Sequence, residues 1–514
     1  MQMPTQTPQF HRPIRLSLLA LACAAAVGCA SVQPVAVAPQ EMASQIQKDA
    51  GAMRQDVVPL SGPLTLEEAL ARALKFNLDR RSRMMEEALA RGQMDVSKFD
   101  MLPKIMAQAG YTERDRARFT YSSTFPSETP DLSRSPATTS ARSAYTADLG
   151  LTWSMLDLGL GYYGAKQQAD RFLIAGEKRR KAMHLLMQDV RTAYWRAASA
   201  QLLKADVQKT IALAEEALTD SRKASGERVR NPLEPLRYQR QLLENLRLLE
   251  NINQELSSAQ VDLAALINAP AGQGIQIATT DLKNIDDEVT KVAVDKLEEV
   301  ALLNNPDLRE QHYNSRIAQE ETRRTILRMF PNLSFNYGGK YNTDSYLMSN
   351  NWNEAGVQLS FNLMNLLTAD TQMKLSKAGV ALADQRRVAT QAAVLTQVHL
   401  SRLQVINARS QFDRADAIYD TDNKIAQVMR TRQSVQAQSK LDVVSTETAS
   451  ILSLLRRYQA LAQVQVAENR MLATLGLEPQ IGSTHELPLN ELTEQITRSK
   501  APWQQIAQGT KAGK

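Results

Sequence analysis

Hydrophobic and polar residues alternate along residues 145–155, so that an extended chain there has one apolar side and one polar side. The apolar side carries Tyr145, Ala147, Leu149, Leu151, Trp153 and Met155. About 11 residues of this alternation, with aromatic residues near both ends, are roughly what a tilted strand needs to cross a bilayer with lipid outside and water inside. A half-buried strand of a soluble sheet shows the same period, so this segment by itself leaves both interpretations open.

Three further segments have the same period. Residues 333–342 and 356–363 repeat the alternation, and residues 105–111 do so more weakly, because Met106 falls on the side that is otherwise polar. A soluble sheet has no reason to keep one side so uniformly small and polar, and this favours strands that cross a membrane. The four strands are expected to form two hairpins, at residues 103–156 and 331–364.

The segments between the hairpins have the period of amphipathic helices. Leucine and alanine recur at helical spacing from Leu66 onward, and Pro103 ends this helix. No proline interrupts residues 157–230, which predicts a helix of about 70 residues, on the order of 100 Å long. Asn231 and Pro232 break it, and a second helix of roughly 37 residues follows.

The same order of elements occurs twice. Asn77 corresponds to Asn305 at a spacing of 228 residues, whereas Trp153 corresponds to Phe361 at a spacing of 208. The difference lies in the loop between the two hairpin strands, which has about 30 residues in the first copy and about 10 in the second. Because loop length is tolerated at a free surface, we expect this loop to lie at one.

The helix lengths predict how the two copies pack. In the first copy the helix before the hairpin, about 35 residues, and the helix after the break, about 37, together equal the long helix of about 72. Two short helices stacked end to end can therefore run beside one long helix, in an antiparallel column that turns at a tip near Arg230 and Gln438. Four strands cannot close a barrel, since small barrels need about eight, and an open sheet edge is not tolerated in lipid. Several copies must share one barrel.

The N-terminus has the pattern of an export signal. Basic residues precede an apolar run over residues 16–27 that is too short for a stable spanning helix, which is typical of a secretory signal. The run ends in Ala26-Val27-Gly28-Cys29, which resembles a bacterial lipoprotein processing box with Cys29 as the acylated first residue, carrying for instance palmitate. Ala30 follows without an aspartate, and this resembles lipoproteins sorted to the outer membrane. Cys23 would leave with the signal, so no disulfide is expected.

The expected organisation is a signal peptide (1–28), a lipidated, extended N-terminal arm (29–62), repeat 1 (63–270), a linker (271–292), repeat 2 (293–478) and a C-terminal tail (479–514). The fold class that this predicts is mainly α with a transmembrane β part and two internal repeats. After the signal no run of 18 or more apolar residues occurs, so strands must do any spanning.

Composition narrows the possible functions. The net charge is +6, but Lys and Arg alternate with Glu and Asp along the helical segments, which is typical of solvated helix faces and disfavours nucleic-acid binding. The five histidines are scattered, none has a metal-ligand spacing, and we expect no enzyme activity, metal or cofactor. The GxGxxG of Gly159–Gly164 follows an alternating strand and opens a helix far too long for a dinucleotide fold, so we interpret it as an elbow where backbones crowd.

An internally repeated helical column with two hairpins, a signal and a lipid-acceptor cysteine resembles the outer-membrane efflux proteins, the TolC family. The residues that carry the resemblance are Leu66-Glu67-Glu68-Ala69-Leu70, Asn304-Asn305-Pro306-Asp307-Leu308, Pro103, Pro331, the segment 151–157 and Leu441-Asp442-Val443-Val444. The resemblance implies a homotrimer with a 12-stranded β-barrel in the outer membrane and a helical tunnel through the periplasm. It also implies two partners, a periplasmic adaptor and an inner-membrane transporter.

The resemblance further implies a constriction at the tip. Asp442 aligns with a family position whose carboxylates ring the periplasmic entrance, and like charges held close there favour cations. Ser445 stands where the family often has a second acidic residue, and Glu234 is the equivalent in the first repeat. The alternative is that Asp442 and Glu234 stabilise helix N-termini, which is worth about 0.3–1 kcal/mol each.

Basic residues gather at both tips. These are Arg228, Arg230 and Arg237 at one and Arg430, Arg432 and Lys440 at the other. We hypothesise that they dock an adaptor or bridge neighbouring tips to keep the entrance shut, against the alternative of solvated loop charges.

The function that the sequence favours is a passive conduit of a tripartite efflux system that exports drugs or other small molecules. A secretion channel for protein or polysaccharide is one alternative, and a periplasmic helical lipoprotein or adaptor that never crosses the membrane is another.

Overall fold

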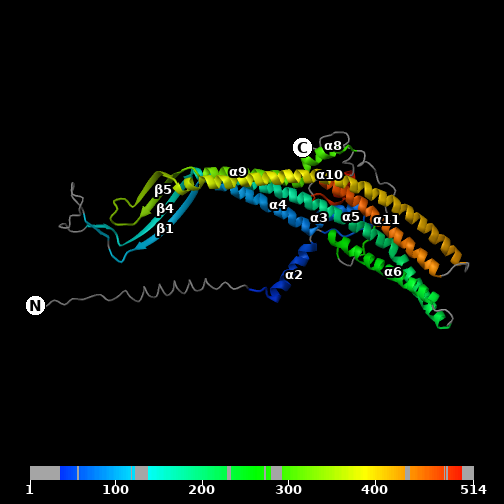
Figure 1. Cartoon of the computed structure of the whole chain (residues 1–514). Helices are drawn as coiled ribbons and strands as arrows, with labels where there is room; N and C mark the ends of the chain where they lie inside the picture. Colours follow the sequence, from blue (N-terminus) through cyan, green and yellow to red (C-terminus); the bar gives the residue numbers. More distant parts are fainter. Residues whose placement is uncertain are drawn as a thin grey trace. The chain divides into compact units, whose positions relative to one another are not determined.

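The computed structural model describes residues 35–54, 57–116, 118–121, 137–227, 233–270, 274–278, 292–434, 440–479, 481, 484 and 486–499. The chain divides into two compact units, residues 1–56 and 57–514. The first unit contains α2 (Pro39–Arg54), a helix none of whose residues is buried (Figure 1). The expected extended arm is therefore wrong over these 16 residues, which consist largely of good helix formers and carry Glu41 in the first turn and Arg54 in the last, where each charge complements the helix dipole.

Two very long helices dominate the second unit. They are α5 (Met155–Glu227), with 73 residues, and α10 (Leu363–Ser434), with 72. At 1.5 Å per residue each is about 110 Å long, as the proline-free stretch predicted. Each is followed by a shorter helix, α6 (Leu233–Leu266) or α11 (Lys440–Leu475).

The helix before each hairpin is broken once, where the sequence predicted a continuous helix. The first is divided into α3 (Leu66–Phe76) and α4 (Leu78–Ser97), followed by the short 3-10 turn η1 (Lys98–Met101), and the second into α8 (Val294–Asn304) and α9 (Pro306–Leu327). The breaks fall at Asn77 and Asn305, whose side chains accept hydrogen bonds from the amides of Arg80 (3.0 Å) and Leu308 (3.1 Å). An asparagine that caps a new helix in this way competes with the helix it interrupts.

The helices of the second unit pack as two overlapping rows of four. On the side of the strands the order is α4, α5, α9 and α10, and on the other side it is α6, α5, α11 and α10 (Figure 1). The long helix α5 thus runs beside four short helices, α4, α6, α9 and α11, whereas α10 runs beside two, α9 and α11. Short helices packed along a long one are what the matching lengths predicted. We use "tip" for the ends of α5 and α10 together with the starts of α6 and α11.

The four long strands form one antiparallel sheet in the order β1 (Lys104–Glu113), β4 (Ser143–Ser154), β5 (Asn332–Asn342) and β6 (Asn351–Ser360). The two hairpins, far apart in sequence, are joined by the pairing of β4 with β5. Because β4 ends at Ser154 and α5 begins at Met155, the sheet continues directly into the helices.

Smaller elements lie where the sequence predicted loop or tail. A two-stranded ribbon, β2 (Arg118–Thr120) with β3 (Ala137–Ser140), occupies part of the first hairpin loop. The helix α12 (Leu489–Arg498) packs against α3 with Leu492 and Ile496 buried. Among the described helices, none combines the length and the apolarity that crossing a bilayer requires.

Of the three glycines of the GxGxxG pattern, Gly161 lies where two backbones approach closely, as expected, whereas no atom would lie within 4 Å of a Cβ on Gly164. A Cβ on Gly161 would lie 2.9 Å from the main-chain carbonyl of Asp100 in η1, and one on Gly159 would lie 2.9 Å from Leu327 of α9. The first two glycines of the pattern therefore serve packing at the start of α5.

Candidate functional site

The register of the sheet aligns the apolar sides of all four strands on one face. Leu149 lies opposite Ala107 of β1 and Gly339 of β5, and Phe335 lies opposite Trp153 and Val357. The face carries Ile105, Ala107, Ala109, Tyr111, Tyr145, Ala147, Leu149, Leu151, Trp153, Leu333, Phe335, Tyr337, Tyr341, Ala355, Val357 and Leu359. Many of these side chains are exposed, Val357 by 67% and Leu359 by 71%. An exposed apolar face of this extent marks a surface that meets lipid or protein.

The opposite face of the sheet is polar. It carries mainly Gln, Asn, Ser, Thr and Gly, with the charged residues Lys104, Asp148, Lys340 and Glu354. Lys104 pairs with Asp157 at 2.7 Å and Lys340 with Glu354 at 2.6 Å. Two large apolar residues interrupt this face. One is Met106, which the sequence showed, and the other is Trp352, which became evident only from its register opposite Lys340.

The edges of the sheet and of the helix rows are uncovered within the described part of the chain. Every residue of β1 and of β6, the two edge strands, is exposed. The outer helices carry exposed apolar residues as well, with Leu375 of α10 exposed by 75%. Further examples are Leu366, Leu367, Leu382, Leu403 and Ile418 on α10, Met85, Leu89 and Val96 on α4, and Leu236, Leu243 and Val261 on α6.

At the tip, Asp442 lies in the first turn of α11, half-buried, and its main-chain carbonyl accepts a hydrogen bond from Thr446 Oγ1 at 2.9 Å. Ser445 accepts a hydrogen bond from Asn245 Nδ2 of α6 at 3.2 Å, which joins the two helices that follow the tip. Glu234 lies on α6, but its side chain is outside the described part of the chain.

Lys440 and Arg430, two of the basic residues proposed at the tip, pair with acids of the same chain. Lys440 Nζ lies 2.8 Å from Glu216 and 2.7 Å from Asp220 of α5, and its hydrogen bonds to Asp220 and Glu216 raise the pKa of this ammonium. Arg430 of α10 pairs with Glu447 of α11 through two hydrogen bonds, which raise the pKa of Arg430.

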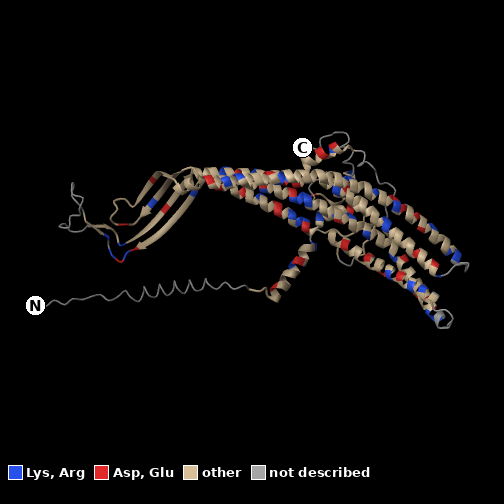
Figure 2. Cartoon of the chain, viewed as in Figure 1, with Lys and Arg blue, Asp and Glu red and all other residues tan. Residues whose placement is uncertain are grey.

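Of the other four basic residues, the structure describes two. Arg237 and Arg432 are exposed, whereas Arg228 and Arg230 lie outside the described residues, as does Cys29. Figure 2 shows that charges of both signs are mixed along the helices, as the sequence predicted, while the strands carry few.

A cavity lined by both charged and apolar side chains, which sequence reasoning missed, lies between α4, α5 and the segment after α11. It has a volume of about 540 Å³ and is lined in part by Arg80, Glu87, Arg179 and Glu478. Arg179 pairs with Glu87 at 2.6 Å, and Arg80 donates a hydrogen bond to Thr484 Oγ1 at 3.0 Å. Burial, with the nearby charge of Arg179, lowers the pKa of Arg80 to about 10. Within the described ranges, no group of three or more His, Cys, Asp or Glu side chains is arranged to hold a metal ion.

The arrangement is a two-faced, open-edged sheet that leads directly into a bundle of helices about 110 Å long. No family model and no curated protein matches the chain. Solved structures do share its fold, however. The Campylobacter jejuni CmeC outer membrane channel matches with a TM-score of 0.62 at 12% identity, over 84% of this chain and 89% of that chain.

Two more channels match over similar lengths. The Neisseria gonorrhoeae MtrE outer membrane channel has a TM-score of 0.59 at 16% identity, over 80% of this chain and 89% of that chain. The outer-membrane channel OprN has a TM-score of 0.59 at 15% identity, over 80% and 90%. The chain therefore has the fold of these channels, and the expectation of a TolC-like fold, mainly helical with a four-stranded antiparallel part, is confirmed.

Proposed function

We propose that this protein is the outer-membrane channel of a tripartite export system, a passive conduit from the periplasm to the exterior. The observation that carries the proposal is the register of the sheet, which gathers the apolar sides of four strands on one face and the polar sides on the other. Such a sheet suits a pore wall with lipid outside and water inside. The shared fold with outer-membrane channels supports the same function.

The open edges support a trimer. Three copies of the four-stranded sheet supply 12 strands, so β6 of one chain can pair with β1 of the next and no edge is left in lipid. In the same arrangement the exposed apolar residues of α10 meet those of α4 and α6 on the next chain, and the helices close into a tunnel. The energy for transport comes from an inner-membrane transporter, reached through a periplasmic adaptor, and the conduit itself catalyses no reaction.

At the tip, three copies of Asp442 form a ring that favours cations at the narrow entrance. The ion pairs of Lys440 with α5 and of Arg430 with α11 hold the tip segments together and so keep the entrance shut at rest. Arg237 and Arg432, both exposed, form the proposed adaptor-docking set together with Arg228 and Arg230. We take small molecules as the substrate class, in preference to secreted protein or polysaccharide, and susceptibility profiling of a deletion strain tests this choice.

Lipidation of Cys29 anchors the arm to the outer membrane. Metabolic labelling with radioactive palmitate should mark the wild-type protein and the control Cys23→Ser, because Cys23 lies in the expected signal. Cys29→Ser should carry no label. Label on Cys29→Ser would place the acyl chain elsewhere and remove this part of the proposal.

The decisive experiment for the conduit compares two lysine substitutions at neighbouring positions of β6. Val357→Lys puts a charge on the apolar face, where it costs about 2–4 kcal/mol near the bilayer midplane, so the variant should lose outer-membrane assembly. Gln358→Lys puts the same charge on the polar face and should assemble as detergent-requiring, heat-modifiable trimers. If both variants and the wild type behave as soluble monomers, the protein is a periplasmic lipoprotein or adaptor and the proposal of a conduit is wrong.

A further inference from the structure

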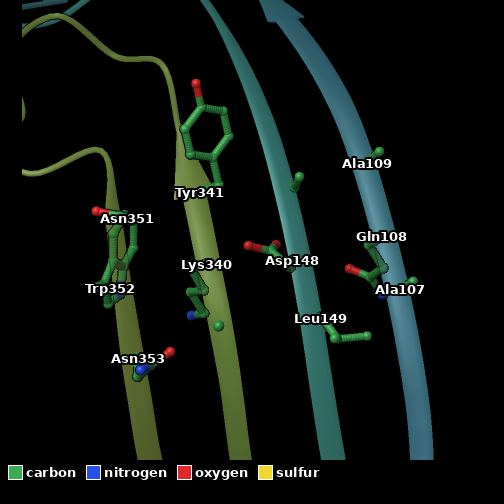
Figure 3. A pocket seen from close by; sticks show the side chains of 12 residues that line it. Ala107, Gln108, Ala109, Asp148, Leu149, Lys340, Tyr341, Asn351, Trp352 and Asn353 are labelled. Atoms are coloured by element: carbon green, nitrogen blue, oxygen red, sulfur yellow. The ribbon is translucent and has the colours of Figure 1, made fainter.

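One level of the sheet carries a chain of polar-face side chains across all four strands. In the register of the strands, Gln108 lies opposite Asp148, Asp148 lies opposite Lys340, and Lys340 lies opposite Trp352. Figure 3 shows these four residues on four successive strands, at a hollow of about 700 Å³. We call Gln108, Asp148, Lys340, Trp352 and the adjoining Glu354 the charged row.

The charges of the row do not cancel. The Lys340 ammonium lies 2.6 Å from the Glu354 carboxylate, so Glu354 neutralises Lys340. Asp148 remains as the additional negative charge, so the row carries one net negative charge per chain.

The rest of the polar face carries almost no charge, so the charged row dominates the electrostatics of this face. In the four described strands the only other charged residue of the polar face is Lys104, which lies at the end of β1 beside the helices and pairs with Asp157. All other positions are uncharged, so no further charge offsets the row within the sheet. The side chains are also accessible, since the Lys340 and Glu354 side chains are 40% and 57% exposed.

We propose that the charged row is a selectivity level of the conduit, which favours small cations and cationic organic solutes within the β part of the pore. This rests on the proposed function, in which the polar face lines the lumen and three chains bring three net negative charges to one level. Rings of carboxylates in a pore raise the local concentration of cations and repel anions. This level lies in the sheet, separate from the tip, where Asp442 lies.

The test is the reversal potential of purified trimers in planar bilayers under a potassium chloride gradient. At about 0.1 M salt, where the Debye length is about 10 Å, wild type should be cation-selective, and Asp148→Asn should lower the permeability ratio of K⁺ to Cl⁻ by roughly twofold or more. Lys340→Gln should raise it, because two uncompensated carboxylates then remain. The double variant Asp148→Asn/Glu354→Gln leaves Lys340 alone and should turn the preference toward anions.

Two controls separate the possible outcomes. Glu113→Gln removes a carboxylate from β1 on the opposite side of the same sheet and should leave the ratio unchanged. Asp442→Asn changes the tip, and the shifts caused by the row variants should persist in its background. Pores whose selectivity is the same in all row variants would overturn the inference and leave the conduit intact, whereas absence of pores in the wild type would overturn the proposed function itself.

Discussion

The side-chain amide of Asn305 donates a hydrogen bond to the main-chain carbonyl oxygen of Thr474 across 2.8 Å. Its Oδ1 accepts from the amide of Leu308, so that one buried side chain caps the start of α9 and the end of α11. Asn77 repeats this joint in the first copy, where its Nδ2 lies 3.1 Å from the carbonyl oxygen of Leu266. The joint is how two short helices are stacked end to end beside a long one.

Substitutions at Asn305 should separate these two roles. Asn305→Ala removes both hydrogen bonds and should lower the free energy of unfolding by about 2–4 kcal/mol, because an N-cap is lost and a buried carbonyl loses its donor. Asn305→Asp keeps the cap but cannot donate to Thr474, so it should fall between Asn305→Ala and wild type. Urea unfolding in detergent measures both.

The control is Asn304→Ala, because the side-chain amide of Asn304 donates to the carbonyl of Val300 within its own helix. This substitution should lower the free energy of unfolding by less than about 1 kcal/mol. If the Asn305→Ala and Asn304→Ala proteins unfold at the same urea concentration, the joint contributes nothing.

Asn268 and Gly476 occupy equivalent places after α6 and α11, both with positive φ (54° and 66°), yet they tolerate different side chains. A Cβ at Gly476 would collide with the main-chain carbonyl of Asn304. Gly476→Asn should therefore destabilise by more than about 1 kcal/mol, although asparagine accepts this backbone conformation. Asn268→Gly should change stability by less than about 1 kcal/mol. Thermal unfolding with wild-type behaviour in Gly476→Asn would contradict the close approach.

His184 should make the protein sensitive to acid. The imidazole is 4% exposed, neither ring nitrogen has a hydrogen-bond partner within the described part of the chain, and burial lowers its pKa to about 4. Between pH 6.5 and about 4 the unfolded chain binds a proton here that the folded chain does not, so stability falls as the pH falls through this window. The loss amounts to about 3 kcal/mol when the pH reaches the folded-state pKa.

His184→Leu should remove most of that dependence, measured as the difference in unfolding free energy between neutral pH and the low end of the window. The exposed His312 provides the control, and His312→Gln should keep the full dependence. An unchanged slope in His184→Leu would mean that other groups cause the acid sensitivity.

The ion pair of Arg430 with Glu447 should hold the tip shut. Arg430→Glu places two carboxylates together, and the conductance of the reconstituted channel should rise as α10 and α11 separate at their ends. The exchange Arg430→Glu/Glu447→Arg restores the pair and should return the conductance to the wild-type value. Arg432→Glu is a reversal of the same size two residues away and should have a smaller effect, and equal conductance changes at both positions would refute the role of the pair.

The hydrophobic periodicity of the sequence predicted much of the fold, because each period reflects the local geometry of a helix or a strand. Alternation of apolar and polar residues predicted the faces of β1, β4 and β5 and of the second half of β6, where the expected run of 356–363 overlaps the strand at 356–360. A proline-free stretch predicted α5. The breaks at Asn77 and Asn305 were missed although Asn305 precedes a proline. Each side-chain amide also donates to the main-chain carbonyl of Leu266 or Thr474, more than 150 residues away in the chain, and the local sequence does not show this contact.

For the candidate site, too, the sequence predicted some features and the packing of distant segments decided others. The sequence identified Lys440 and Arg430 as charges near a chain reversal, but only packing brought them to Glu216, Asp220 and Glu447. The ribbon of β2 and β3 was missed because its strands, of 3 and 4 residues, are too short to display a period.

The amino-acid order alone determined the two-sided strands, the lengths of the long helices and the repeat, since backbone geometry and the separation of apolar from polar side chains act on neighbouring residues. Tertiary structure alone decided the pairing of β4 with β5, the row from Gln108 to Trp352 and the isolation of His184. These depend on the register between segments distant in the chain, and a shift of one residue between two strands turns every side chain to the other face without changing the sequence pattern.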